Sequence, residues 1–142
     1  GADPMIACFD AKYHYLSWRP LHAIARADSD GNPLTEPDPT WQPLRPTPNH
    51  PEYPSAHACH STAVAVALQE FFGTNKVPLS LDSLVTGERR YYARLTDVVR
   101  EVNLARVWAG FHFWSSDREG SILGRMVGRY VVRHFPVRCQ RR

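Results

Sequence analysis

Three short polar clusters interrupt the apolar stretches of this 142-residue chain, and each contains residue types that bind anions or transfer protons. The first cluster, residues 12–20, carries two cations, Lys12 and Arg19. Their spacing of seven residues corresponds to about two helical turns, so both could reach one side of a helix. Two converging cations without an intervening carboxylate suggest a bound anion. Two independent surface side chains are the plainer alternative.

The second cluster, residues 54–57 with the sequence PSAH, stands at the predicted start of an apolar helix. Helix N-termini carry unpaired N–H groups and a positive partial charge, so they hold anions readily. Ser55 could cap the helix or donate its hydroxyl to a ligand, and His57 could act as a general acid or base. A simple N-cap with an incidental histidine is the plainer alternative. A zinc site is disfavoured, because the nearby His and Cys residues show no second ligand pair of regular spacing.

The third cluster, residues 106–117, places Arg106 and His112 among aromatic and apolar residues. Burying a charge in such surroundings is costly unless a group of opposite sign is bound. Asp117 could orient His112 through its other ring nitrogen. A core histidine together with an arginine that pairs with a glutamate would explain the same pattern without a ligand.

Together the clusters supply three cations, a hydroxyl, a helix N-terminus and two histidines. Phosphoryl transfer without magnesium needs this combination: neutralisation of the oxyanion charge, a nucleophile and a proton donor.

Four predicted helices must position these groups, which gives an all-α fold, a helical bundle of about four core helices. The first begins near Asp3, presents Ile6, Phe9, Tyr13 and Leu16 on one face, and ends at Pro20. The second covers residues 55–73 and is apolar on every side in its middle, as expected for the centre of a bundle.

The third predicted helix covers residues 95–108, with Val98, Val102 and Ala105 facing inward. The fourth begins with a capping box at residues 116–119. Its predicted apolar stripe consists of Leu123, Met126, Val127, Tyr130, Val131 and His134. A ladder of arginines at 125, 129 and 133 is expected to face solvent or a partner.

Two loops connect these helices. Eight of the 12 prolines fall within residues 33–54, where regular structure cannot continue. Because this long Pro-rich loop leads directly into PSAH, we expect it to pack over the site. Residues 74–90 are predicted to form a second loop.

The composition excludes several protein classes. With 43% apolar and 22% charged residues, the chain has enough apolar material for one folded domain, residues 1–142, and is not disordered. No apolar stretch approaches the roughly 20 residues of a membrane span and no signal peptide is evident, so we expect a soluble protein without membrane partners. A net charge of +3 is too small to indicate nucleic acid. Three scattered cysteines, Cys8, Cys59 and Cys139, are expected to be free thiols.

The three motifs in this order, K-x6-RP, PSAH and R-x5-H, resemble the superfamily of type 2 phosphatidic acid phosphatases and vanadium-dependent haloperoxidases. The flanking sequences DAKYH and HPEYPS look more like its soluble bacterial haloperoxidase-related branch than its membrane-embedded lipid phosphatases. The resemblance spans residues 12 to about 128.

The resemblance implies a role for each residue of the motifs. The groups that would bind phosphate or vanadate are Lys12, Arg19, Ser55, Ala56 (through its backbone N–H) and Arg106. His112 would be the axial ligand of vanadium, or the nucleophile that becomes phosphorylated. His57 would be the acid–base residue on the opposite side, and Asp117 is the candidate for orienting His112.

The sequence departs from the family pattern at three places. Ala56 replaces the glycine of PSGH, which should be tolerated if its conformation is helical. Ser116 stands where the family has an aspartate, and Asp117 lies one residue later. Finally, the chain starts almost at the first motif, so it is expected to lack the family's N-terminal helices and to form a homo-oligomer.

Three functions remain open at this point. The leading prediction is a vanadate-dependent haloperoxidase that oxidises halide with hydrogen peroxide. The alternative is a metal-independent acid phosphatase that acts on phosphomonoesters through a phosphohistidine. A non-catalytic domain that binds oxyanions or assembles with a partner is the third.

Overall fold

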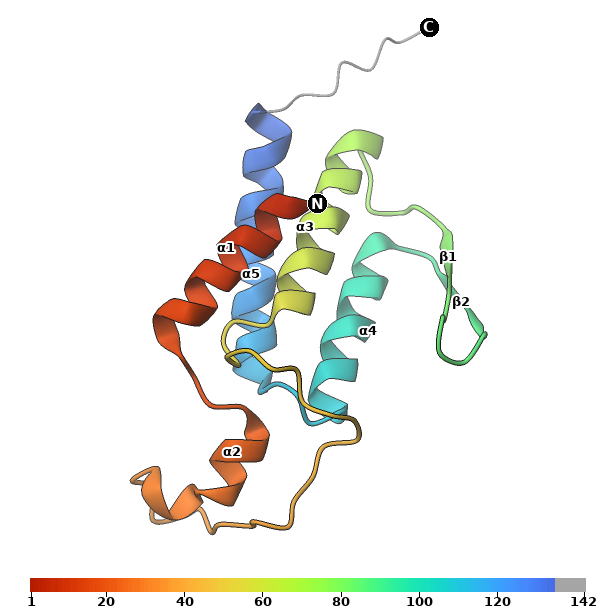
Figure 1. Ribbon diagram of the computed structural model, residues 1–142. Coiled ribbons are helices and arrows are strands. Elements are labelled where there is room, and N and C mark those ends of the chain that lie inside the picture. Colours follow the sequence, from red (N-terminus) through yellow and green to blue (C-terminus); the bar gives the residue numbers. More distant parts are fainter. Residues whose placement is uncertain (135–142) are drawn as a thin grey trace, which may run out of the picture.

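The computed structural model describes residues 1–134 and shows a bundle of helices, which confirms the predicted fold class (Figure 1). The elements are α1 (Ala2–Tyr15), α2 (Pro20–Ala25), the 3₁₀ helix η1 (Ala27–Ser29), α3 (Ala56–Phe72), β1 (Leu79–Asp82), β2 (Arg89–Tyr92), α4 (Leu95–Trp108) and α5 (Trp114–His134). Within the described part of the chain, no helix is long and apolar enough to span a membrane.

Helix α3 forms the centre of the bundle and packs against α1, α4 and α5. Ser55 is its N-cap and accepts a hydrogen bond from the backbone N–H of Ala58, at 3.5 Å. Gly73 ends the helix in the left-handed conformation with a φ of 68°, which favours glycine. The limits and the central place predicted for this helix are therefore confirmed.

Helix α5 packs closely on α3 through three glycines, Gly120, Gly124 and Gly128, which recur every four residues. A Cβ atom at Gly128 would lie 2.9 Å from the carbonyl oxygen of Ala63, and one at Gly124 would collide with the carbonyl oxygen of Cys59. The absence of side chains at these positions lets the two backbones approach each other.

Two predictions for α5 are wrong. Met126 and Tyr130 of the predicted apolar stripe are 65% and 58% exposed, because the glycine face is the one that meets α3. The predicted capping box is also wrong, because α5 begins at Trp114 and Ser116 lies buried within its first turn.

Helix α1 differs from its prediction in length and in orientation. It ends at Tyr15, where Leu16 adopts a φ of 51°, and Pro20 instead begins α2. Its buried residues are Pro4, Cys8 and Lys12, since the short Cys8 side chain packs between α1 and α3. Most of the predicted apolar face points outward: Ile6, Tyr13 and Leu16 are 68%, 59% and 63% exposed. Its fourth member, Phe9, packs against the core.

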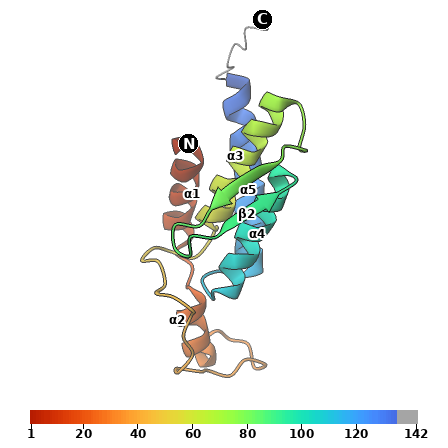
Figure 2. The ribbon, with the colours of Figure 1, turned by 90° about the vertical axis from the view of Figure 1, so that its right-hand side faces the viewer.

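The segment between α3 and α4 is not a simple loop. β1 and β2 form an antiparallel hairpin in which Leu79 pairs with Tyr92, and this hairpin lies beside α4 (Figure 2). Helix α4 has the predicted limits, but Ala105, which was predicted to face inward, is exposed.

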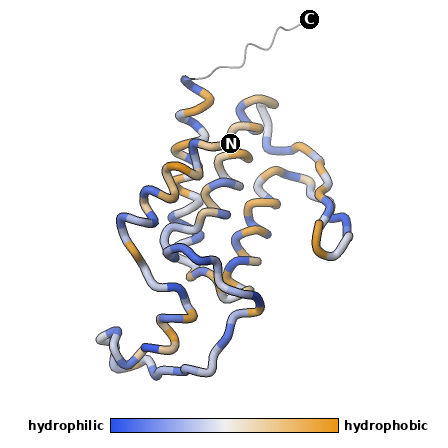
Figure 3. The backbone as a smooth tube through the Cα atoms, in the orientation of Figure 1, coloured by the Kyte–Doolittle hydropathy of each residue, from blue (hydrophilic) through white to orange (hydrophobic). Residues whose placement is uncertain are grey.

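Residues 30–55 contain no helix or strand, as the proline content predicts. The first part of this Pro-rich loop is largely hydrophilic in Figure 3 and runs past the end of the bundle where α4 stops and α5 starts. There the backbone N–H of Leu44 donates to the carbonyl of Ala109, and that of Glu52 donates to the carbonyl of Ser17. The loop is thus fastened to the end of the bundle that carries the three motifs.

Candidate oxyanion site

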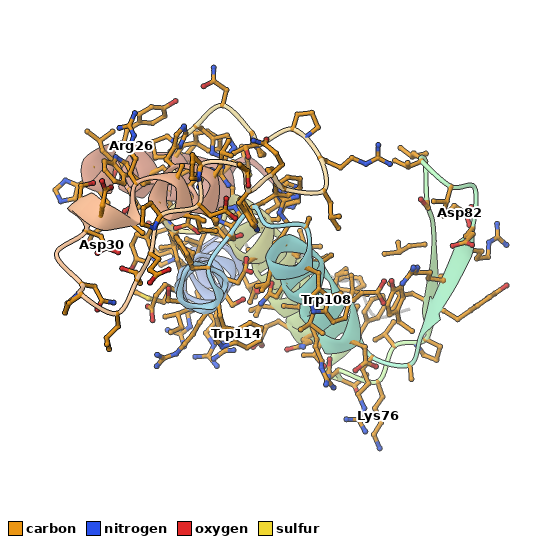
Figure 4. The ribbon with its side chains drawn as sticks, turned by 90° about the horizontal axis from the view of Figure 1, so that it is seen from below. Arg26, Asp30, Lys76, Asp82, Trp108 and Trp114 are labelled. Atoms are coloured by element: carbon orange, nitrogen blue, oxygen red, sulfur yellow. The ribbon has the colours of Figure 1, made fainter. Side chains whose placement is uncertain are left out.

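The three motifs meet at one end of the bundle, seen from below in Figure 4. The end of α1, the start of α3 and the turn between α4 and α5 come together there, and Trp108 and Trp114 mark the two sides of that turn. Residues 50–52 of the Pro-rich loop contact the first and the third motif.

The two cations of the first motif both bind the backbone of this loop. Lys12 is fully buried, and its Nζ donates to the carbonyl oxygens of Pro51 and Glu52 at 2.7 and 2.9 Å. Arg19 is 3% exposed, and its Nε donates to the carbonyl oxygen of His50 at 3.0 Å. Desolvation lowers the pKa of Lys12 to about 8 and that of Arg19 to about 10.

Lys12 and Arg19 converge as predicted, but not through the predicted spacing of two turns on one helix. Arg19 lies beyond the end of α1 with an extended backbone, φ −70° and ψ 155°, so the two cations do not share a helix face. They converge because the loop brings a row of carbonyl oxygens to both.

His112 is the most enclosed histidine of the three motifs, at 3% exposed. Its Nδ1 lies 2.8 Å from Oε1 of Glu52, and its Nε2 lies 3.0 Å from Nη1 of Arg19. Desolvation lowers the pKa of His112 to about 4, so the ring is neutral at pH 7. Because a carboxylate can only accept, the ring proton belongs on Nδ1, and the lone pair of Nε2 is directed at the cations.

Glu52 is a site residue that the sequence analysis did not identify. Its carboxylate is buried and accepts hydrogen bonds from His112, from the backbone N–H of Phe113 at 3.0 Å, and from the hydroxyl of Ser116. Desolvation raises the pKa of Glu52, but the hydrogen bonds from His112 and Ser116 outweigh it and hold the pKa below its ordinary value. The available signal for Glu52 in the sequence was its position three residues before Ser55. Because an irregular loop has no periodicity, this position does not predict where the side chain points.

Asp117 does not orient His112, because Glu52 occupies that place. Asp117 is fully buried, and neither of its carboxylate oxygens has a hydrogen-bond partner within residues 1–134. The Ser55 hydroxyl lies close by but outside hydrogen-bonding geometry. Desolvation raises the pKa of Asp117 to about 6, although the neighbouring Ser55 hydroxyl and the positive charge of Arg106 oppose this shift.

Arg106 has an unsatisfied buried donor. Its guanidinium carbon lies 4.5 Å from the centre of the Phe111 ring, and its Nε has no hydrogen-bond partner in the described chain. Desolvation lowers the pKa of Arg106, and the negative charge of Asp117 acts against this. An orphaned guanidinium N–H beside two further buried cations is a donor set suited to an oxyanion.

The N-terminus of α3 completes the site. Ala56 is the first helical residue, so alanine fits the helical conformation there and its N–H lacks an intrahelical partner. His57 follows in the first turn and keeps an exposed side. Partial desolvation, together with the positive charge of Arg106, lowers the pKa of His57 to about 4.

A cavity of about 380 Å³ opens beside this helix start. It is lined by Met5, Phe9, His50, Ala56, His57, His60 and Ser61. It reaches His57 from solvent and is large enough for a small substrate. Although three histidines line it, residues 1–134 contain no group of three His, Cys, Asp or Glu side chains placed to hold a metal ion.

The thiols take no part in the site. Cys8 and Cys59 are free and buried, and their Sγ atoms donate to the carbonyl oxygens of Pro54 and Pro4. Cys139 lies outside the described residues.

Comparisons with known proteins place the chain in a family. The family model described as the VCPO second helical-bundle domain matches residues 1–140. A search of curated proteins gives no match.

Solved structures share the fold. The crystal structure of the first bacterial vanadium-dependent iodoperoxidase is 29% identical with a TM-score of 0.79, over 93% of this chain and 30% of that one. The apo-type bacterial vanadium-dependent chloroperoxidase is 22% identical with a TM-score of 0.73, over 92% of this chain and 34% of the other. The holo-type structure is 23% identical with a TM-score of 0.70, over 92% and 33%. The chain thus spans about a third of the length of these proteins. The family match over residues 1–140, together with the fold and the order of the motifs, shows that the chain belongs to the vanadium haloperoxidase-related VCPO second helical-bundle domain family.

Proposed function

We propose that this domain binds vanadate and oxidises halide with hydrogen peroxide. The observation that carries the proposal is the neutral imidazole of His112, whose Nε2 lone pair faces the buried Arg19 while Glu52 holds its other nitrogen. A neutral imidazole nitrogen is a metal ligand, and the surrounding cations suit the oxygens of a tetrahedral oxyanion.

Each residue of the site would have one task. The groups that would hold the oxygens of vanadate are Lys12, Arg19, Ser55, Ala56 (N–H) and Arg106. His112 would be the ligand to vanadium, and His57 would move protons at the side open to the cavity. When bound, vanadate supplies the Lewis acid that activates peroxide toward attack by halide.

Arg19 would have to change partner when the oxyanion binds. Its Nη1 now donates both to Nε2 of His112 and to the carbonyl of Phe111, the latter at 2.8 Å. The N–H that now points at Nε2 of His112 would then donate to a vanadate oxygen. The other hydrogen bond of Nη1, to the carbonyl of Phe111, would keep the guanidinium in place.

A paired assay tests the proposal: bromination of an organic probe with vanadate and peroxide, beside hydrolysis of a phosphomonoester without vanadate. We expect bromination by the wild-type chain, its loss in His112→Ala, and its retention in the control His22→Ala, which changes an exposed histidine of α2. Bromination that survives in His112→Ala would contradict the assigned ligand.

Hydrolysis without bromination would instead support the phosphatase alternative, which uses the same residues. In that case vanadate should inhibit hydrolysis, and His57→Ala should lower it by about 10²–10⁴-fold, the usual contribution of a general acid. Absence of both activities would support a non-catalytic oxyanion-binding or assembly domain.

A further inference from the structure

We infer that Glu52 is the positioning residue for His112, and that Ser116 and the Phe113 N–H hold Glu52 in place for this task. The inference concerns a contact within the protein itself; its consequence for oxyanion affinity rests on the proposed function above.

The geometry of the Glu52 carboxylate leaves it little freedom. Oε1 accepts from Nδ1 of His112 at 2.8 Å and from the N–H of Phe113 at 3.0 Å, while Oε2 accepts from the hydroxyl of Ser116. Glu52, His112 and Ser116 are 2%, 3% and 1% exposed, so water does not compete for these bonds. A buried carboxylate with three donors is fixed in orientation, and it fixes the imidazole ring in turn.

The backbone of Glu52 joins the same network. Its carbonyl accepts from Nζ of Lys12 at 2.9 Å, and its N–H donates to the carbonyl of Ser17 at 3.0 Å. One loop residue therefore links the first motif, through Lys12, to the third motif, through His112. A shift of Glu52 would move a cation and the imidazole together.

The charge of Glu52 has a chemical effect as well as a geometric one. A carboxylate on Nδ1 keeps the proton on that nitrogen and increases the electron-donating power of Nε2. Nε2 is the nitrogen that faces Arg19, at 3.0 Å from its Nη1. Glu52 thus acts through His112 on whichever group Nε2 meets.

Asp117 is the competing candidate, since it is also buried and near the site. Its two oxygens have no hydrogen-bond partner in the described chain, while both oxygens of Glu52 are occupied. This contrast supplies a matched pair of isosteric substitutions, Glu52→Gln and Asp117→Asn.

Proton NMR of the vanadate-free protein tests the contact directly. An imidazole N–H held by a buried carboxylate gives a resonance far downfield of ordinary amide protons, and we expect one such signal in the wild type. The signal should disappear in His112→Ala, shift upfield in Glu52→Gln and persist in Asp117→Asn and in the exposed control Glu36→Gln. A signal that Glu52→Gln leaves in place and Asp117→Asn removes would overturn the inference.

Ligand affinity then separates a positioning role from a merely structural one. Glu52→Gln should weaken vanadate binding by about 10–100-fold, the usual effect of removing an outer-shell partner of a metal-bound histidine. It should change phosphate binding little, because phosphate needs the cations but no bond from Nε2. Equal weakening of both anions would show that Glu52 only maintains the fold of the site. If the wild type binds no vanadate, the proposed function fails, and the NMR signal still decides the Glu52–His112 contact.

Discussion

At the scale of single residues, the buried cations of the site outnumber its buried carboxylates. Lys12, Arg19 and Arg106 carry positive charge, while Glu52 already serves His112 and Asp117 has a pKa raised to about 6. Both Arg106 and Asp117 keep polar atoms without hydrogen-bond partners in residues 1–134. Unsatisfied buried groups are costly, and a bound oxyanion would compensate the cations.

Substitution of Arg106 should therefore separate binding from folding. We expect Arg106→Ala to weaken phosphate binding by about 10–100-fold, because a charged hydrogen bond is worth about 1.5–3 kcal/mol. The fold should survive, since the Nε of Arg106 has no partner to lose. Isothermal calorimetry would measure this, with Arg100→Ala, an exposed arginine of the same helix, as the control. Unchanged affinity in Arg106→Ala would make Arg106 a purely structural residue.

Asp117 predicts an unusual dependence of stability on pH. Because the pKa of Asp117 is raised from 3.8 to about 6 in the folded protein, its ionisation above pH 6 costs stability, by at most about 3 kcal/mol. Asp117→Asn should thus raise the free energy of unfolding at pH 7.5 by about 2 kcal/mol. The gain should shrink as the pH falls below 6 and vanish only below about 3.8, where the wild-type carboxyl is protonated in both states. Urea unfolding at several pH values measures this, with the exposed Asp10→Asn as control; a destabilised Asp117→Asn at pH 7.5 would contradict the account.

The motifs made most site residues predictable, but not the contacts between them. The types and order of Lys12, Arg19 and Arg106 suffice to predict a cationic site. The partner of His112 was not predictable in this way, because Glu52 reaches it from a loop 60 residues away in sequence. Asp117, the nearer carboxylate in sequence, is on α5 but has no bond to the ring.

At the scale of elements, the contact between α3 and α5 positions the site. Backbone hydrogen bonding continues this contact at the site itself, where the N–H of Ser55 donates to the carbonyl of Ser116 at 3.0 Å. The start of α3 and the first turn of α5 are thus held in register, and the glycine face of α5 continues this contact along the two helices.

Gly124→Ala should therefore destabilise the protein, although alanine normally favours a helix by about 1 kcal/mol over glycine. The added Cβ would collide with the carbonyl oxygen of Cys59, and overpacking of this kind costs about 1–3 kcal/mol. Thermal unfolding would report the loss. Arg129→Ala, an exposed substitution on the same helix, should change stability by no more than about 0.5 kcal/mol. An unchanged or higher melting temperature in Gly124→Ala would show that the two helices are packed less closely.

Helix limits were predictable where a capping signal was present, as for α3 with Ser55 and Gly73. Helix faces were less predictable, because the strongest apolar pattern does not always mark the buried side. On α1 the small Cys8 faces α3, and on α5 the glycines do, since close helix packing selects small residues over large apolar ones. The β-hairpin was missed because its two strands have only four residues each.

At the scale of the whole molecule, α1 presents its apolar side to solvent. Ile6, Tyr13 and Leu16 are more than half exposed, and contiguous apolar patches of this kind are uncommon on monomers. We expect the 142-residue chain to associate with a second copy through this face. Light scattering at micromolar concentration should give a dimer, and the double substitution Ile6→Ser, Tyr13→Ser should give a monomer. The control Leu84→Ser changes an exposed loop leucine; a monomeric wild type would contradict this prediction.

Vanadate binding, measured by calorimetry with and without phosphate, tests the central claim that the three motifs form one oxyanion site. Because both anions need the same cations and the same helix N-terminus, we predict one vanadate per chain and competition by phosphate. Arg106→Ala should weaken both anions, and His112→Ala should weaken vanadate more than phosphate. A wild-type chain that binds no vanadate, or binds it with an affinity that phosphate leaves unchanged, would contradict the account.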